Sequence, residues 1–180
     1  MRNTVVNPDS LKNPAYHWFG EARFGMFINF SLASLFGEDL GYQMAHPMPY
    51  RDYEANIAKF NPTGFRATDW VGLAKEAGCR YVTLVAKHTE GFCLWDTKTT
   101  DWNSVRSPFG RDIVREVADE CRRQGMRFCV YLNEDDHHSR FKPNIPGNWG
   151  DRNWRRDDDD PDWDKHAAYL ERQLTELLTN

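Results

Sequence analysis

Residues 80–95 read RYVTLVAKHTEGFCLW, and this stretch decides the fold. It opens with an apolar, β-branched run at residues 81–86, which is too short for a helix and predicts a strand buried on both faces. Polar residues follow at 87–90, and Gly91 allows a sharp bend. In parallel α/β proteins, ligands bind just past the carboxyl ends of the strands. We therefore expect any chemistry of this chain to involve His88 and its neighbours.

The same patterns predict two more strands, at residues 23–30 and 127–132, and helices at 16–22, 52–59 and 112–124. Another helix starts at Thr68 or Asp69 as N-cap and ends at Gly78. Its predicted buried face consists of Trp70, Leu73, Ala74 and Ala77. A last helix begins near Asp162, with an apolar stripe formed by Trp163, Ala167, Leu170, Leu174, Leu177 and Leu178.

The resulting order is β-α-β-α-β-α, with tight turns into the strands and long polar loops out of them. Intervening helices force parallel pairing, and this loop pattern is typical of a (β/α)8 barrel, a fold of about 250 residues. Three strands cannot close a barrel. We therefore expect an α/β fold that is a partial (β/α)8 TIM barrel, its first three βα units. Residues 1–14 are expected to form an arm, and 15–180 the N-terminal portion of the barrel domain.

Composition excludes several classes of protein. The 180 residues are 40% hydrophobic and 28% charged, which is typical of a globular chain. A net charge of -4 without a basic tract argues against a nucleic-acid partner. Four isolated cysteines, with no CxxC pair, argue against a zinc knuckle. No run is long enough to span a membrane and no leader is visible, so the expected location is cytoplasmic unless a signal peptide has been removed.

Several motifs resemble those of one family, the alpha-L-fucosidases of glycoside hydrolase family 29. Residues 24–30, FGMFINF, resemble its first-strand motif, and 60–65, FNPTGF, its FNPTxF element. Residues 87–95, KHTEGFCLW, followed by TDWN at 100–103, are similar to its KHHDGFCLW…TDWN signature. Several positions depart from the pattern. Asn29 and Thr89 replace histidines, and Phe30 and Ser31 stand where Trp and Gly are usual. Glu90 replaces an aspartate, and Leu132 replaces a tyrosine.

The resemblance implies a (β/α)8 barrel that hydrolyses terminal alpha-L-fucose with retention, without a cofactor, so a fucosylated glycan is the expected partner. Retention needs two carboxyl groups roughly 5 Å apart. In the family the nucleophile ends strand four and the acid/base lies further on, so we expect no catalytic residue here and no activity of the chain alone. The implied substrate contacts are Asn29, His88, Thr89, Glu90, Trp95 and Tyr131.

Other interpretations stay open at the level of sequence. His88 could bond within its own loop, Glu90 could cap the bend, and Trp95 and Tyr131 could pack in the core. His88, His137 and His138 could belong to a metal-dependent hydrolase, although their spacing is poor for chelation. The strand-exit carboxylates at residues 134–136 alternate faces, and the run at 157–160 lacks the pattern of an EF-hand. The chain could also be a non-catalytic fragment that binds carbohydrate, self-associates, or pairs with a complementing C-terminal polypeptide.

Overall fold

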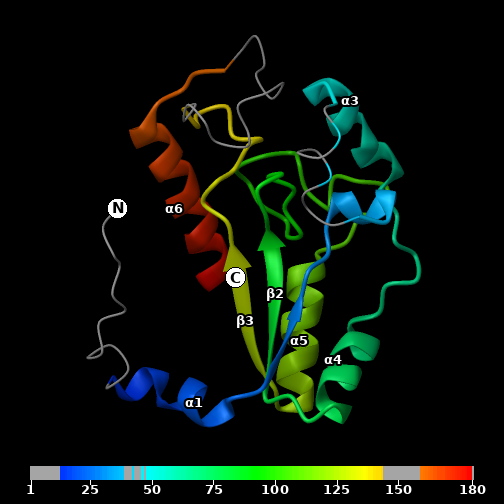
Figure 1. Ribbon diagram of the computed structural model, residues 1–180, viewed down its shortest axis with the longest axis vertical. Coiled ribbons are helices and arrows are strands. Elements are labelled where there is room, and N and C mark those ends of the chain that lie inside the picture. The colour runs from blue at the N-terminus through cyan, green and yellow to red at the C-terminus, as the bar shows by residue number, and fades with distance from the viewer. Residues whose placement is uncertain (1–12, 39–41, 43–45, 47, 144–158, 180) are drawn as a thin grey trace.

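The computed structural model describes residues 13–38, 42, 46, 48–143 and 159–179 (Figure 1). Most of the expected arm and Asp157 and Asp158 of the aspartate run lie outside these residues. Along the chain, the elements are α1 (Pro14–Ala22), β1 (Gly25–Ile28), η2 (Leu32–Phe36), α3 (Tyr50–Glu54), η3 (Ala55–Lys59), α4 (Ala67–Glu76), β2 (Tyr81–Lys87), α5 (Ile113–Gln124), β3 (Arg127–Leu132) and α6 (Trp163–Thr179). No helix of the described part is both long and apolar enough to cross a lipid bilayer.

The three strands form one parallel sheet in the order β1-β2-β3. Gly25 pairs with Tyr81, and Tyr81 pairs with Arg127, so the three strands start level. Their carboxyl ends therefore lie at one edge of the sheet, as Figure 1 shows. This confirms an α/β fold with parallel strands. β1 is shorter than the predicted 23–30, because Arg23 ends α1 with a positive φ of 55° and Phe24 has no strand partner.

One face of the sheet packs against α4 and α5, which lie side by side (Figure 1). Val82, Leu84 and Ala86 of β2 point to this face and are fully buried. The other face is more open: Thr83 is half-buried, and Phe27 of β1 has 60% of its surface exposed. The predicted burial of the central strand on both faces is therefore incomplete among the described residues.

Two helix boundaries follow the sequence signals and one does not. Asp112 caps α5 by accepting a 2.8 Å hydrogen bond from the Arg115 backbone N–H, and Gly125 ends the helix in the left-handed region, as predicted. The predicted start of α4 was wrong, because Arg66 occupies the N-cap position. Its buried face is also different, formed by Ala67, Val71 and Ala74. Ala74 belongs to both sets, whereas the predicted Leu73 has 59% of its surface exposed.

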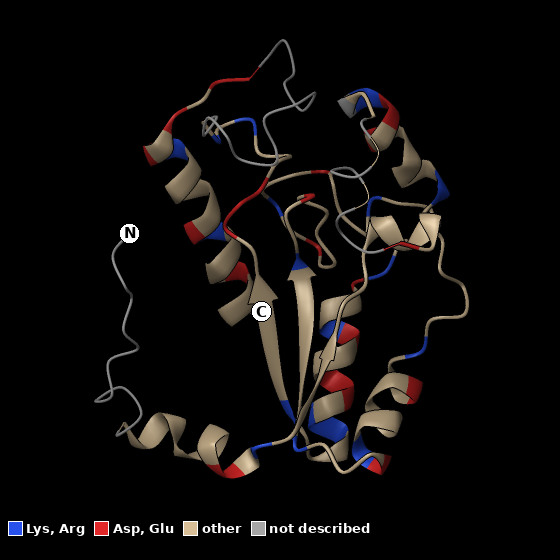
Figure 2. Cartoon of the chain, in the orientation of Figure 1, with Lys and Arg blue, Asp and Glu red and all other residues tan. Residues whose placement is uncertain are grey.

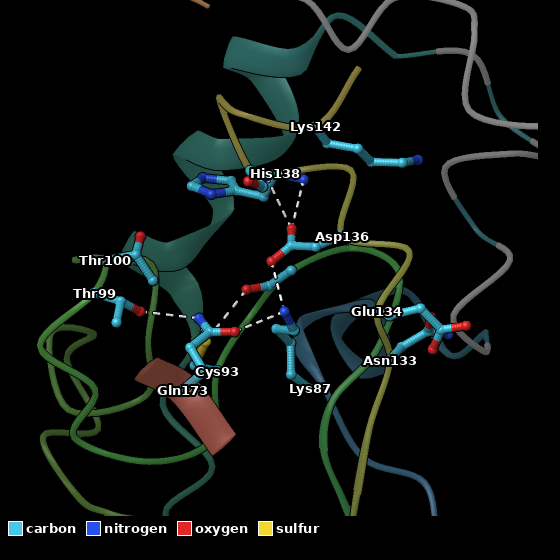
Figure 3. A network of polar contacts seen from close by, with 12 residues as sticks. Lys87, Cys93, Thr99, Thr100, Asn133, Glu134, Asp136, His138, Lys142 and Gln173 are labelled. Carbon is cyan, nitrogen blue, oxygen red and sulfur yellow. Dashed lines mark hydrogen bonds and ion pairs between the residues drawn. The ribbon is translucent and has the colours of Figure 1, made fainter. Parts of the chain in front are cut away.

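The buried face of α6 is polar and differs from the predicted apolar stripe, of which Leu177 packs against the core. His166, Tyr169 and Gln173 are buried, whereas Trp163, Leu174 and Leu178 have between 43% and 77% of their surface exposed. The reason is a set of hydrogen bonds between α6 and the strand exits (Figure 3). Gln173 Oε1 accepts from Lys87 Nζ at 2.7 Å, and Gln173 Nε2 donates to Thr99 Oγ1 at 3.0 Å.

Lys87 is the centre of this network. Its ammonium lies 2.7 Å from Asp136 Oδ2, and neither side chain has any exposed surface. The other oxygen, Asp136 Oδ1, accepts from the backbone N–H groups of His138 and Ser139, each at 2.9 Å. Burial would raise the pKa of Asp136, but the charge of Lys87, together with His138, keeps that pKa below its ordinary value. The ion pair thus joins β2, the loop after β3 and α6.

A glycine is required at position 91 because the loop after β3 packs closely against it. Its φ is 79°, a conformation that favours glycine. A Cβ atom added at Gly91 would lie 2.4 Å from Asp136 Oδ1 and 2.4 Å from His138 Cβ. The bend after β2 therefore both turns the chain and leaves room for the loop after β3.

We predict that Gly91→Ala destabilises the protein more than Gly78→Ala. Gly78 also has a positive φ, of 84°, but an added Cβ would meet no atom within 4 Å. The control should lose about 1–2 kcal/mol from backbone strain alone, whereas Gly91→Ala should lose at least about 3 kcal/mol because of the steric overlap. Urea unfolding of both variants measures the difference. Equal losses would contradict the crowding inferred here.

We predict that Lys87→Met costs about 3–5 kcal/mol of unfolding free energy, because it leaves the Asp136 charge buried without its partner. The double variant Lys87→Met/Asp136→Asn removes both charges and keeps the acceptor oxygen used by the loop. It should therefore recover part of the loss. A double variant no more stable than Lys87→Met in the same denaturant titration would show that the unpaired charge is not the cause.

Candidate substrate-binding site

The strand exits bring together the side chains of His88 and Tyr131. His88 follows β2, Tyr131 lies near the end of β3, and their rings stack with centroids 5.8 Å apart and an interplanar angle of 23°. Phe27 of β1 adds an edge-on contact to Tyr131 at 5.8 Å. All three side chains belong to the open face of the sheet. We call this set, Phe27, His88 and Tyr131, the aromatic wall.

Polar groups accompany the aromatic wall. His88 Nδ1 lies 3.0 Å from Thr89 Oγ1, which orients the imidazole ring. The hydroxyl of Tyr131 accepts a hydrogen bond from Asn133 Nδ2 at 3.3 Å. Asn29 directly follows β1 and is exposed; by strand alternation it belongs to the same face as Phe27. The predicted residues Asn29, His88, Thr89 and Tyr131 therefore lie at one edge of the sheet, and all of them keep some exposed surface.

Glu90 and Trp95 do not share this surface. Glu90 is 2% exposed, and its carboxylate accepts a hydrogen bond from the Tyr53 hydroxyl. Trp95 is 3% exposed and donates from Nε1 to Glu176 Oε2 on α6 at 2.9 Å. It borders a groove of about 1020 Å³ on the helix side of β3. Sugar contact by either residue stays a prediction that no observation tests, and both side chains have protein partners.

The carboxylates after β3 are mostly engaged by cations. Asp135 forms an ion pair with Lys142 and lies 3.1 Å from His137 Nε2. Burial would raise the pKa of Asp135, but these partners hold it below the ordinary value. Asp136 is paired with Lys87, and Glu134 is exposed. Figure 2 shows these acidic residues in the loop beyond β3, whereas basic residues gather at the opposite ends of β3 and α5.

His137 and His138 each have a protein partner. His137 pairs with Asp135, whereas His138 lies 3.3 Å from Glu54 Oε1 and stacks on Trp102 with centroids 4.8 Å apart. Burial lowers the pKa of His137. Across the residues that the structure describes, no group of three or more histidine, cysteine, aspartate or glutamate side chains could hold a metal ion. The metal-dependent interpretation therefore finds no support in this region.

Sequence reasoning missed several residues that shape the site. Phe27 was treated only as part of a strand, and its exposure follows from the open face of the sheet. Tyr53 lies 37 positions before its partner Glu90, and Gln173 lies 86 positions after Lys87. No local pattern encodes such pairings. The one available signal was the alternation of β1, which places Phe27 on the same face as Asn29.

Comparison with known proteins agrees with the resemblance seen in the motifs. The sequence profile of the alpha-L-fucosidase family matches residues 3–180. Alpha-L-fucosidase 1 of Arabidopsis thaliana is 42% identical over 89 residues, which cover 47% of this chain and 17% of that protein. Among solved structures, alpha-L-fucosidase isoenzyme 1 from Paenibacillus thiaminolyticus superposes with a TM-score of 0.84 and 33% identity. It matches 93% of this chain, and the match covers 40% of that structure.

A second solved relative is alpha-L-fucosidase AlfC from Lactobacillus casei in complex with alpha-L-fucose product, with a TM-score of 0.81 and 29% identity. The match covers 93% of this chain and 58% of that one. The chain thus spans less than two thirds of the length of each of these relatives. The profile match over residues 3–180 and the two structural superpositions agree with each other. This chain belongs to the alpha-L-fucosidase family, glycoside hydrolase family 29.

Proposed function

We propose that this chain contributes one side of the substrate site of a retaining exo-glycosidase that removes terminal alpha-L-fucose from glycoconjugates. The observation that carries the proposal is the stacking of His88 on Tyr131 at the carboxyl edge of the sheet. In a parallel α/β protein this edge is where substrates bind. The family of the chain supplies the reaction class.

The chemistry of the aromatic wall suits a deoxy sugar. A fucose ring presents apolar C–H groups and a methyl group, which pack against aromatic faces such as those of Phe27 and Tyr131. His88, Asn29 and Thr89 offer hydrogen-bonding groups for its hydroxyls. The similarity to the Lactobacillus casei protein solved with alpha-L-fucose product supports this choice of sugar.

We also propose that residues 15–180 are the front of a (β/α)8 barrel. Three parallel strands, the helices between them and loops that all leave one edge of the sheet support this architecture. β1 and β3 each pair with one strand among the described residues, so both outer edges offer backbone groups to further strands. A complementing C-terminal polypeptide is the partner that this arrangement suits.

The isolated chain is proposed to bind the sugar without cleaving its bond. Retention needs a nucleophile and an acid/base about 5 Å apart. Three of the carboxylates after β2 and β3 already have protein partners: Glu90 with Tyr53, Asp135 with Lys142, and Asp136 with Lys87. Such engagement disfavours a free catalytic pair on this part of the chain.

Titration with L-fucose, monitored by saturation-transfer NMR, tests binding. We expect weak binding, with a dissociation constant on the order of 1 mM, and a loss of about tenfold in His88→Ala, because a hydrogen-bonding group is removed. His17→Ala, an exposed histidine on α1, is the matched control and should bind like the unchanged protein. D-fucose should bind at least several-fold more weakly. Equal affinity of the two histidine variants would refute the proposed role of His88.

The test of catalysis is incubation with an aryl alpha-L-fucoside. We expect no release of the aryl group by the purified chain, because Glu90, Asp135 and Asp136 are held by other partners. Retaining hydrolysis that resists further purification and is lost in Glu134→Gln would refute this expectation, since Glu134 is the exposed carboxylate of the β3 exit.

Self-association is a second candidate, favoured by apolar surface. Phe27 is 60% exposed and Leu178 is 77% exposed, whereas such groups are more often covered in stable assemblies. Light scattering is expected to give a mass above the 21.1 kDa of one chain. Phe27→Ser should lower the measured mass toward that of one chain. Phe24 lies just before β1 and is 56% exposed, and the control variant Phe24→Ser should leave the mass unchanged. A monomeric mass for the unchanged protein at all concentrations would exclude self-association.

A further inference from the structure

The Glu90 carboxylate is enclosed by segments that are distant in sequence. Glu90 lies in the loop after β2 and is 2% exposed; Tyr53 lies on α3 and is 1% exposed. The Tyr53 hydroxyl donates to Glu90 Oε2. Because both groups are out of contact with solvent, loss of this hydrogen bond would leave a buried polar group unsatisfied. The pair therefore fixes α3 to the bend after β2.

The same carboxylate faces the loop after β1. The Ser31 side chain and the backbone of Leu32 and Ala33 lower the pKa of Glu90, and Glu90 Oε1 is buried without a hydrogen-bond partner among the described residues. Ser31 also begins η2, where its Oγ accepts from the Ala33 N–H at 3.2 Å. Glu90 thus bonds to α3 and lies within electrostatic reach of the start of η2.

These contacts determine how two of the proposed sugar contacts are spaced. Asn29 lies two residues before Ser31, and His88 lies two residues before Glu90. The side chains of Asn29 and His88 leave different strands, and the buried carboxylate is where their following loops meet. Movement of one loop away from the other would separate the two side chains.

We propose that Glu90 is a positioning residue: it holds the loop after β1 and helix α3 against the loop after β2, so that Asn29 and His88 form one sugar-facing surface. This inference rests on the proposed function of Asn29 and His88 as sugar contacts. It assigns Glu90 an internal role in place of the direct sugar contact expected from the motif.

The position of Glu90 also makes the contact sensitive to pH. Burial raises its pKa from 4.5 to about 6, although Ser31, Tyr53, Leu32 and Ala33 oppose the shift. When the loops separate, the carboxyl group is hydrated and titrates near its ordinary value. The closed arrangement is therefore favoured while Glu90 is protonated, and that preference is lost as the pH rises through about 6.

Other charged and titratable groups surround this position and define the controls. Tyr53 faces Glu90 from α3, with Tyr42 behind it. Asp136 and His138 approach from the loop after β3, across Gly91. Lys87 neutralises Asp136, and Glu54 pairs with His138. Comparison with a Glu90 variant separates the titration of Glu90 from that of the nearby histidines.

Hydrogen exchange at residues 31–36 tests the inference without a ligand. After correction for intrinsic exchange, protection in the unchanged protein should fall by about eightfold from pH 5 to pH 8, because part of the effect of this pKa shift is already lost below pH 5. Glu90→Gln, a neutral isostere, should show no such pH dependence. Glu90→Ala should lose at least about tenfold in protection at pH 5, with residues 113–124 of α5 unchanged as evidence of an intact core.

Two further variants complete the experiment. Tyr53→Phe keeps the ring and removes the hydroxyl, so it should lose part of the protection even if Glu90→Ala does not fold. Glu76→Ala, an exposed glutamate on α4, is the matched control. Protection in Glu90→Ala and Tyr53→Phe within twofold of the control, or identical pH dependence in the unchanged protein and Glu90→Gln, would overturn the inference.

Sugar affinity then decides whether the positioning matters for binding. Glu90→Ala should weaken L-fucose binding by about tenfold at pH 5, and Glu90→Gln should bind like the unchanged protein at that pH. Reduced protection with full affinity would refute the positioning role toward the sugar. If the unchanged protein binds no L-fucose, the proposed function fails, and the exchange data still decide whether Glu90 holds the loops together.

Discussion

Two opposite charges, Lys87 and Asp136, are enclosed at the end of the sheet where the strands give way to loops. Each is costly to bury alone, and only their contact at 2.7 Å makes the arrangement tolerable. The constraint extends outward, because Gln173 must then satisfy Lys87, and the loop after β3 must present its N–H groups to Asp136. The position of α6 and the shape of the strand exits both depend on this ion pair.

The candidate site consists of side chains at the strand exits that stay accessible beside the buried charged groups. The ion pair and the Glu90 carboxylate occupy the interior of the strand exits, whereas His88, Asn29 and Tyr131 remain accessible next to them. Charged groups thus provide fixed geometry, and hydrogen-bonding groups and rings form the surface proposed to meet the sugar. This division is physically sensible, since a monosaccharide carries hydroxyls and C–H faces but no charge for a buried ion pair to recognise.

Sequence predicted those features that depend on near neighbours. The strand at 127–132, the Asp112 cap and the left-handed Gly78 and Gly125 all follow from local chemistry, and the motif around His88 indicated the strand exit where the site is proposed. The polar buried face of α6 was not predicted, because apolar periodicity cannot reveal that Gln173 is needed by Lys87. The inward direction of Glu90 was equally hidden, since it depends on Tyr53 and on the loop at 31–33.

The polar inner face of α6 has a consequence for how that helix docks. A helix that packs through an apolar face can slide along its neighbour at little cost in free energy, because apolar contact is non-directional. A translation of α6 by one helical turn, about 5.4 Å, would move Gln173 out of reach of Lys87 and His166 out of reach of the Glu134 carbonyl. These two hydrogen bonds therefore fix the axial position of α6, because only one position satisfies both of them.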